Sequence, residues 1–240
     1  MKKYLVIGNP IDHSLSPKLH NYWFKKNNII AHYEKKKLAN KDLKDLIINL
    51  KKSKISGINV TVPFKKEIIN HLDSLSFEAE NTQSVNTIYL KDNMAVGHNT
   101  DIEGFEMSIK NINFDTVNKK VLILGAGGVV PSIIFALKQM NLSEIIISNR
   151  TQNKAEDLKK LFPNLKIVNW GDSSDFDIII NATSIGLKDT DQIKLNYINK
   201  QKNKLFYDVI YNPKETNFLK NAKILGNSIV NGKMMFIYQA

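Results

Sequence analysis

The chain has 240 residues, 42% of them hydrophobic, no cysteine and a formal net charge of +11 at pH 7. This length and apolar content exclude a globally disordered chain and suit one large or two modest domains. The lack of cysteine excludes disulfides, thiolate nucleophiles and cysteine-ligated metal sites.

The positive charge does not indicate a nucleic-acid partner. Lysines are spread over both halves of the chain, and there is a single arginine, the residue whose planar fork suits bases and phosphates. No stretch has the apolar length of a membrane span, and the start lacks a secretory apolar run. We therefore expect a cytoplasmic protein without a metal ion, a nucleic-acid partner or a membrane partner.

The first half alternates short β-type runs with helical patterns. The runs lie at 4–8, 31–39 and 55–62, and the helical patterns at 17–28, 40–53 and 64–72. This alternation predicts parallel strands joined by helices. The segments 86–92 and 94–101 flank Asp92-Asn93 and predict a β-hairpin.

The second half repeats the alternation without a detectable sequence repeat. Continuous apolar runs at 121–128, 143–150, 176–184 and 205–211 are typical of strands buried on both faces. Helical patterns at 132–140 and 153–162 separate them. The predicted fold class is α/β, with two α/β units.

The segment VLILGAGGVVPSIIFALK joins a buried strand, a glycine turn and a helix, the order of a dinucleotide-binding unit. Gly125 and Gly127 allow a tight turn and let a pyrophosphate approach free N–H groups at the helix N-terminus. Val130 replaces the third glycine of G-x-G-x-x-G. By pattern alone, a plain strand-to-helix turn is the alternative.

The residues after the next strand bear on the choice between NAD and NADP. NAD-specific units carry an acid there that binds the ribose 2′-hydroxyl, whereas this chain has Asn149, Arg150 and Thr151. An arginine can bind a 2′-phosphate through two hydrogen bonds and lie along the adenine. We expect NADP(H); an exposed surface cation is the alternative interpretation of Arg150.

Two serines precede the first helical pattern. Ser14 and Ser16 face the same way if the segment is extended, with Ser16 as the helix N-cap and Pro17 as the first helical residue. A helix N-terminus with two hydroxyls suits a carboxylate. The alternative for Ser16 is capping alone.

Further polar residues lie at the ends of later runs. Asn59 and Thr61 share one strand face, and Lys65 and Lys66 are expected in the first turn of the next helix. Cations there oppose the helix dipole, an inconsistency typical of functional sites. Asn86 and Asp101 complete the set, although capping the next helix is an alternative role for Asp101.

Together these residues resemble the shikimate dehydrogenase family. The resemblance covers nearly the whole chain and rests on the ordered motifs SLSPKLHN, NVTVPFK, VNT, GHNTD, GAGG, NRT, NATSIG, DVIYNPKET and a terminal QA preceded by NGKMMF. Each motif is weak alone, but the ordered set is specific. It implies an enzyme that reduces 3-dehydroshikimate to shikimate with NADPH, on the route to aromatic amino acids.

The resemblance also implies a division into domains. Residues 1–101, joined by 233–240, would form an N-terminal α/β substrate-binding catalytic domain with a mostly parallel sheet. Residues 102–232 would form a Rossmann-type NADP-binding domain. The chain is expected to be a monomer or a homodimer.

The same motifs imply roles for single residues. Lys65 and Asp101 would be the catalytic pair, with Lys65 stabilising charge and transferring a proton. Contacts to the substrate carboxylate region would come from Ser14, Ser16 and Thr61, and contacts at or beside the ring hydroxyls from Asn86, Asp101, Tyr211 and Gln239. The pyrophosphate would meet Gly125, Ala126, Gly127, Gly128 and Val129; the adenosine phosphate would meet Asn149, Arg150 and Thr151; Val209 and Gly232 would lie near the nicotinamide.

Some positions depart from the family pattern. Gln83-Ser84 stand where Gly-Ala is usual, and Val130-Pro131 is less usual, although Pro131 fits an early helical position. Similar proteins generally continue beyond the terminal Gln-Ala, so Gln239 is expected to be poorly ordered here.

Two other functions compete with this interpretation. One is a quinate or dual quinate/shikimate dehydrogenase, and the other is a non-catalytic NADP-binding sensor. The serine pair and the lack of an acid after Ser148 favour shikimate and NADP. The convergence of Lys65 and Asp101 favours an enzyme over a sensor.

Overall fold

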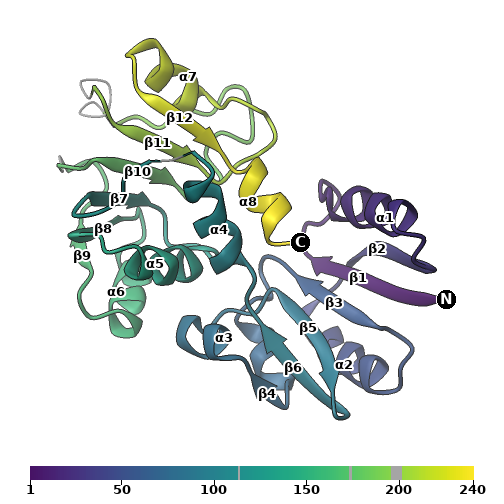
Figure 1. The fold of residues 1–240 in the computed structure, drawn as a ribbon. Coiled ribbons are helices and arrows are strands. Elements are labelled where there is room, and N and C mark those ends of the chain that lie inside the picture. Colours follow the sequence, from purple (N-terminus) through teal and green to yellow (C-terminus); the bar gives the residue numbers. More distant parts are fainter. Residues whose placement is uncertain (113, 173–174, 196–201) are drawn as a thin grey trace. The chain divides into compact units, whose positions relative to one another are not determined.

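The computed structural model describes residues 1–112, 114–172, 175–195 and 202–240. Contacts divide the chain into two units, Met1–Ile102 with Ala240, and Glu103–Gln239. Figure 1 shows the elements of both units. Both are α/β, as the sequence predicts.

The first unit contains a six-stranded sheet with the order β2-β1-β3-β5-β6-β4. Its strands are β1 (Lys2–Gly8), β2 (Ala31–Lys37), β3 (Gly57–Val60), β4 (Ser74–Leu75), β5 (Thr87–Lys91) and β6 (Met94–His98). Its helices are α1 (Ser16–Lys26), α2 (Leu43–Lys51), α3 (Phe77–Thr82) and the 3₁₀ helices η1 (Asn40–Asp42) and η2 (Glu67–His71). β5 runs antiparallel to β3 and β6, and the other neighbours pair in parallel, which confirms a mostly parallel sheet.

The hairpin β5–β6 forms where Asp92-Asn93 predicts it. Both residues adopt positive φ, 52° and 63°, the left-handed conformation that a two-residue hairpin turn needs and that Asp and Asn tolerate. Thr87 pairs with His98 at the open end of the hairpin. Asn86, just before β5, therefore lies beside the residues that follow β6.

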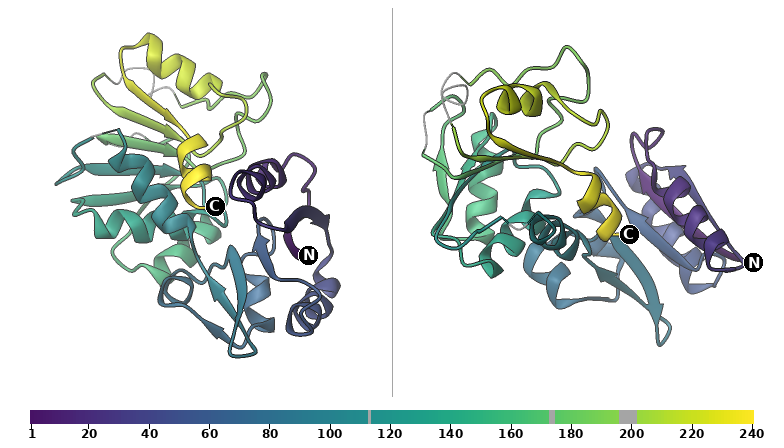
Figure 2. Two further views of the ribbon diagram at one scale, coloured as in Figure 1. Left: turned by 45° about the vertical axis from the view of Figure 1, so that its right-hand side comes forward. Right: turned by 45° about the horizontal axis from the view of Figure 1, so that its top comes forward.

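Alternate side chains of β1 pack into different cores on the two faces of the sheet. Leu5 and Ile7 belong to the cluster that holds the buried residues of α2, whereas Val6 belongs to a smaller cluster with Tyr33 and Phe24 of α1. The period of two follows from strand geometry. The sheet therefore has α2 on one face and α1 on the other, as the views in Figures 1 and 2 show.

The second unit has a parallel sheet with the order β12-β11-β10-β7-β8-β9. Its strands are β7 (Lys120–Leu124), β8 (Glu144–Ser148), β9 (Lys166–Val168), β10 (Ile178–Asn181), β11 (Leu205–Asp208) and β12 (Ser228–Asn231). Its helices are α4 (Asp101–Lys110), which begins at the boundary, α5 (Val130–Gln139), α6 (Gln152–Leu161), α7 (Asn217–Ile224) and α8 (Lys233–Tyr238). This is the strand order of a Rossmann fold, and its order reverses between β7 and β10.

The C-terminal helix differs from the expectation. Residues 233–240 were expected to join the first domain, but 233–239 belong to the second unit. Gly104 of α4 lies so close to α8 that a Cβ there would meet the Gln239 Cβ at 2.8 Å and the Met235 carbonyl oxygen at 2.9 Å. The glycine permits this close helix packing, which ties α8 to α4.

No helix in the described part of the chain has the length and apolar character needed to cross a membrane.

Candidate functional site

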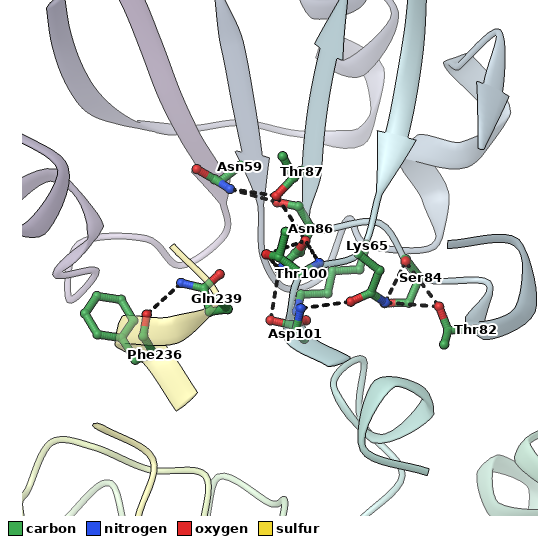
Figure 3. Close-up of polar contacts among 11 residues, drawn as sticks. Asn59, Lys65, Thr82, Ser84, Asn86, Thr87, Thr100, Asp101, Phe236 and Gln239 are labelled. Atoms are coloured by element: carbon green, nitrogen blue, oxygen red, sulfur yellow. Dashed lines mark hydrogen bonds and ion pairs between the residues drawn. The ribbon is translucent and has the colours of Figure 1, made fainter. Parts of the chain in front are cut away.

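The residues Lys65, Asn86 and Asp101 form a buried polar group in the first unit, here called the carboxyl-edge cluster (Figure 3). β3 and β6 end at the same edge of the sheet because they run in the same direction, and the antiparallel β5 begins there. Lys65 follows β3, Asn86 precedes β5 and Asp101 follows β6. The topology thus gathers residues that are far apart in sequence.

The Asp101 carboxylate divides its two oxygens between two partners. Lys65 Nζ forms an ion pair with Oδ2 at 2.5 Å, and the Asn86 amide donates to Oδ1 at 3.0 Å. The side chains of Lys65 and Asp101 are only 10% and 9% exposed. An ammonium has three N–H donors, so Lys65 can hold Asp101 and still donate to a ligand.

Further hydrogen bonds from neighbouring residues fix all three cluster residues. Asn86 Oδ1 accepts a hydrogen bond from the Thr100 N–H at 2.9 Å, and the Lys65 carbonyl accepts one from the Val85 N–H at 2.9 Å. The Asp101 N–H donates to Asn99 Oδ1 at 3.1 Å. The Asn86 side chain and the backbones of Lys65 and Asp101 are therefore fixed by the protein itself.

Sequence reasoning missed the contribution of Asn99. Its amide donates to the Thr82 hydroxyl at 3.0 Å and to the Ser84 carbonyl at 2.9 Å, so this buried side chain joins the segment after β6 to the end of α3. The GHNTD motif contains Asn99, but its partners lie in α3 and in the turn after it. Only the fold reveals them.

The expected helix at Lys65 is wrong in detail. Lys65 and Lys66 lie in a turn, and the 3₁₀ helix η2 begins only at Glu67. The Phe64 N–H bonds the Thr61 carbonyl at 3.0 Å and tightens the chain before the helix. Lys65 is buried, whereas Lys66 is exposed.

The serine segment also differs from its prediction. Ser16 is the first residue of α1 rather than its N-cap, which is Leu15 without a side-chain cap. Ser14 instead accepts a hydrogen bond from the Ser16 N–H at 3.4 Å. Both serines are half-buried, as is Thr61, which follows β3.

The glycine turn of the second unit connects β7 to α5. Gly125 has φ +111°, and a Cβ there would lie 2.9 Å from the Ala182 carbonyl oxygen after β10. Its N–H bonds the Ser148 carbonyl at 2.9 Å, at the end of β8. Ala126, Gly127, Gly128 and Val129 complete the turn before α5, and Pro131 lies in the first turn of that helix, as predicted.

The segment after β8 presents its cation to solvent. Arg150 and Thr151 are exposed, and Asn149 is half-buried, with its amide bonded to the Thr151 carbonyl at 2.7 Å. Within the described residues, no acid forms an ion pair with Arg150. The guanidinium is therefore available to an anionic ligand.

A buried carboxylate that sequence reasoning missed lies beside Val209. Asp208, at the end of β11, accepts hydrogen bonds from Thr216 Oγ1 at 2.6 Å, the Ile210 N–H at 3.0 Å and the Asn181 amide at 3.1 Å. Burial raises the pKa of Asp208 to about 6, against the opposing effect of these hydrogen bonds. The network fixes the chain on either side of Val209.

Three further expected residues lie in the second unit. Gly232 packs against Val209, and the Gly232 N–H bonds the Ile210 carbonyl at 3.1 Å. Tyr211 stacks on Phe236 of α8, with ring centroids 4.7 Å apart. Gln239 is the C-cap of α8, and its amide donates to the Phe236 carbonyl at 2.9 Å.

The sequence matches two family models. "Shikimate dehydrogenase substrate binding domain" covers residues 6–88, and "Shikimate / quinate 5-dehydrogenase" covers residues 108–222. A curated relative, the shikimate dehydrogenase (NADP(+)) of Pelagibacter ubique (strain HTCC1062), is 62% identical over 239 residues, which span 100% of this chain and 90% of the relative.

Solved structures give the same result. The crystal structure of shikimate dehydrogenase from Aquifex aeolicus has a TM-score of 0.92 at 37% identity, covering 100% of this chain and 89% of that one. The shikimate 5-dehydrogenase of Thermus thermophilus, solved with NADP(H) and shikimate, has a TM-score of 0.89 at 29% identity, covering 100% and 90%.

Proposed function

The chain belongs to the shikimate dehydrogenase family, and we propose that it catalyses the reversible, NADPH-dependent reduction of 3-dehydroshikimate to shikimate. The observation that carries this proposal is the buried Lys65–Asp101 pair, held in place by Asn86. Dehydrogenation of an alcohol, and its reverse, need a group that moves a proton at the reacting oxygen. The reaction belongs to the biosynthesis of aromatic amino acids.

Lys65 supplies the proton in the direction of reduction. Bound NADPH supplies a hydride to the ketone carbon. As negative charge develops on the ketone oxygen, the Lys65 ammonium donates a hydrogen bond to it and then a proton, an effect of roughly 10²–10⁴-fold for general acid catalysis. The buried surroundings strengthen this electrostatic stabilisation.

Asp101 orients the Lys65 ammonium through one oxygen and is itself oriented by Asn86 through the other. In shikimate oxidation the same pair accepts the hydroxyl proton. We assign the substrate carboxylate region to Ser14, Ser16 and Thr61. The ring hydroxyls are assigned to Asn86, Asp101, Tyr211 and Gln239.

The second unit fits NADP(H). The backbone turn from Gly125 to Val129 precedes α5, and the N-terminus of a helix after such a glycine turn suits a pyrophosphate. Arg150 is exposed and free of acids among the described residues, so it suits the 2′-phosphate, beside Asn149 and Thr151. Val209 and Gly232 are assigned to the nicotinamide.

Steady-state oxidation rates test this function. We expect kcat/KM to be highest with shikimate and NADP⁺ when shikimate and quinate are each assayed with NADP⁺ and NAD⁺. Faster turnover of quinate with NAD⁺ would support the quinate dehydrogenase alternative. Binding of NADPH without any turnover would support the non-catalytic sensor.

Two adjacent lysines provide a matched pair for the catalytic assignment. Lys65→Ala should lower kcat by roughly 10²–10⁴-fold with little change in the affinity for NADPH. Lys66→Ala should leave kcat near the wild-type value, because Lys66 is exposed. Equal losses in the two variants would refute the role of Lys65.

The predictions of a cytoplasmic location and of a monomer or homodimer are kept as part of this proposal. Analytical ultracentrifugation of the purified chain would test the second of them.

A further inference from the structure

We propose that Asn99 is a positioning residue for the catalytic pair: its side-chain amide ties the backbone of Asp101 to the turn after α3 and so keeps the Asp101 carboxylate against Lys65 and Asn86. The inference rests on the proposed function, which assigns the proton transfer to Lys65 and Asp101. Asn99 has no assigned contact with the substrate or the cofactor, so it acts only through these residues.

One end of the Asn99 amide holds Asp101. Asn99 Oδ1 accepts a hydrogen bond from the Asp101 N–H at 3.1 Å, the local bond that an asparagine can form with the backbone two residues on. Asp101 is the first residue of α4, where backbone N–H groups have no partner within the helix. The bond therefore fixes the chain at the residue whose carboxylate pairs with Lys65 Nζ at 2.5 Å.

The other end of the amide holds the turn after α3. Its nitrogen donates to the Thr82 hydroxyl at 3.0 Å and to the Ser84 carbonyl at 2.9 Å (Figure 3). The Thr82 hydroxyl donates its own proton to the Glu78 carbonyl at 2.6 Å, so it can accept from Asn99. Because a backbone N–H can only donate and a carbonyl can only accept, one orientation of the amide satisfies both ends.

The turn that Asn99 holds contains a residue in an unfavourable conformation. Gln83 is the C-cap of α3 and has φ 48° and ψ 40°, the left-handed conformation that a side chain with a Cβ disfavours. Asn99 donates to the residues on both sides of Gln83, which are Thr82 and Ser84. Its side chain therefore closes the turn across the position where the backbone is least favourable.

The same turn leads to the other two residues of the carboxyl-edge cluster. The Val85 N–H donates to the Lys65 carbonyl at 2.9 Å, and the Asn86 amide donates to Asp101 Oδ1 at 3.0 Å. Asn99 thus connects the segment that holds Lys65 and carries Asn86 to the residue that both of them contact. Asn99 and Asp101 are only 2% and 6% exposed, so the link lies inside the protein.

A second contact joins the same two segments without Asn99. The Thr100 N–H donates to Asn86 Oδ1 at 2.9 Å. Loss of the Asn99 side chain should therefore displace Asp101 rather than release it. We expect a smaller loss of rate than the roughly 10²–10⁴-fold that follows removal of a general acid.

Asn99→Ala removes both ends of the link. We expect kcat for shikimate oxidation to fall roughly tenfold, the effect of about one lost hydrogen bond on the placement of the pair, while the KM for NADP⁺ stays within about twofold of wild type. A merely structural role would lower the midpoint of thermal unfolding and leave the kcat of the folded enzyme unchanged, and that result would overturn the inference.

Asn227→Ala is the matched control. Asn227 is also buried, and its side chain also joins two backbone segments: it accepts from the Lys204 N–H at 3.0 Å and donates to the Ala222 carbonyl at 3.3 Å. These contacts lie in the second unit, before β11 and β12 begin. The variant should lose thermal stability and keep its kcat. An equal fall in kcat in both variants would overturn the inference, because loss of any buried asparagine would then have the same effect.

Thr82→Val tests the link from its far end. The substitution keeps the shape of the side chain and removes the hydroxyl that accepts from Asn99. We expect kcat to fall about two- to threefold, since Asn99 still holds the Ser84 carbonyl. If Asn99→Ala does not fold, this variant decides alone, and a wild-type kcat would overturn the inference.

The double variant Thr82→Val/Asn99→Ala tests whether the two residues act together. It should be no slower than Asn99→Ala alone, and a kcat reduced by the full product of the two single effects would overturn the inference. The wild-type rate distinguishes this role from the proposed function. Normal shikimate oxidation by wild type, with unaltered kcat in both single variants, would refute only the role of Asn99. A wild-type chain that does not oxidise shikimate would refute both.

Discussion

Gly232 lies against the Val209 carbonyl so closely that a Cβ on Gly232 would fall 2.1 Å from its oxygen and 2.6 Å from its carbon. These are backbone atoms after β11, where the Asp208 network fixes the chain. A methyl group cannot be accommodated unless one of the two segments moves. The contact joins the two residues that we assign to the nicotinamide.

Gly232→Ala should therefore reduce both stability and NADPH affinity. Steric overpacking of this kind costs about 1–3 kcal/mol of unfolding free energy, and a displaced Val209 should weaken NADPH binding, measured by fluorescence titration. Gly226→Ala is the control, because Gly226 has φ +81° but open space around its Cβ position. This variant should lose only the ~1 kcal/mol of unfolding free energy that an alanine at positive φ costs, and it should keep its affinity for NADPH.

Arg150→Ala should shift the preference between the two dinucleotides. Loss of a bidentate contact to the 2′-phosphate is expected to cost about 1.5–3 kcal/mol, or roughly 10–100-fold in the KM for NADP⁺. NAD⁺ has no 2′-phosphate, so its KM should not change. An equal effect on both cofactors would show that Arg150 does not bind the 2′-phosphate.

The Lys65–Asp101 pair should be fragile to single substitutions. Removal of one partner from a buried ion pair leaves an uncompensated charge, which costs about 3–5 kcal/mol. We expect this loss of unfolding free energy for Asp101→Asn, measured by chemical denaturation. The double variant Lys65→Met/Asp101→Asn should recover most of it while remaining inactive, and a double variant less stable than Asp101→Asn would contradict this account.

His20 should make the protein less stable in mild acid. Burial lowers the pKa of His20 to about 4, below the value of about 6.5 for an unfolded chain. The unfolded state therefore takes up the proton first, and the stability linked to neutral His20, present above about pH 6.5, is lost as the pH falls toward 4. His20 stacks on the ring of Tyr33, so His20→Phe keeps an aromatic ring against Tyr33 but has no group that titrates. When the pH falls from about 7 to 4, its unfolding free energy should decrease by on the order of 2 kcal/mol less than that of wild type.

Asp208 should make the protein less stable as the pH rises, the opposite of the effect of His20. Its folded pKa, about 6, lies above the unfolded value of about 3.9, so the associated stability is present below about pH 4 and is lost as the pH rises through 6. The full shift corresponds to on the order of 3 kcal/mol. The unfolding free energy of Asp208→Asn should not show this fall between about pH 4 and 7, as chemical denaturation of the variant and of wild type at both pH values would show. If the unfolding free energies of the two proteins changed equally with pH, the prediction would be refuted.

Features that depend on nearby residues were predictable from the sequence. Asp92-Asn93 predicts the hairpin because its two positive φ angles suit those residue types. The glycine turn and the buried strands of the second unit follow from similarly local patterns. The alternation of runs and helices predicts the α/β class, which the structure and its relatives confirm.

Features that depend on distant contacts were missed or wrong. Ser16 was expected to cap α1, but Leu15 is its N-cap and the Ser14 hydroxyl accepts from Ser16. Asn99 and Thr82 are 17 residues apart, and no periodicity connects them. Asp208 looked like an ordinary strand residue, because its partners Asn181 and Thr216 meet it only once the sheet has formed.

Because β5 runs antiparallel to both of its neighbours, β3 and β6, the hairpin can be lengthened at its turn without moving its open end. Thr87 pairs with His98 at the open end and Lys91 with Met94 at the turn. Equal numbers of residues added to both strands at Asp92-Asn93 would extend the ladder outward and leave Asn86 beside Asp101. A single extra residue within β6 would shift the register and turn its side chains to the other face. The turn is therefore a suitable position for grafting a peptide tag or a reporter loop into the enzyme while the chemistry at the other end of the hairpin is preserved.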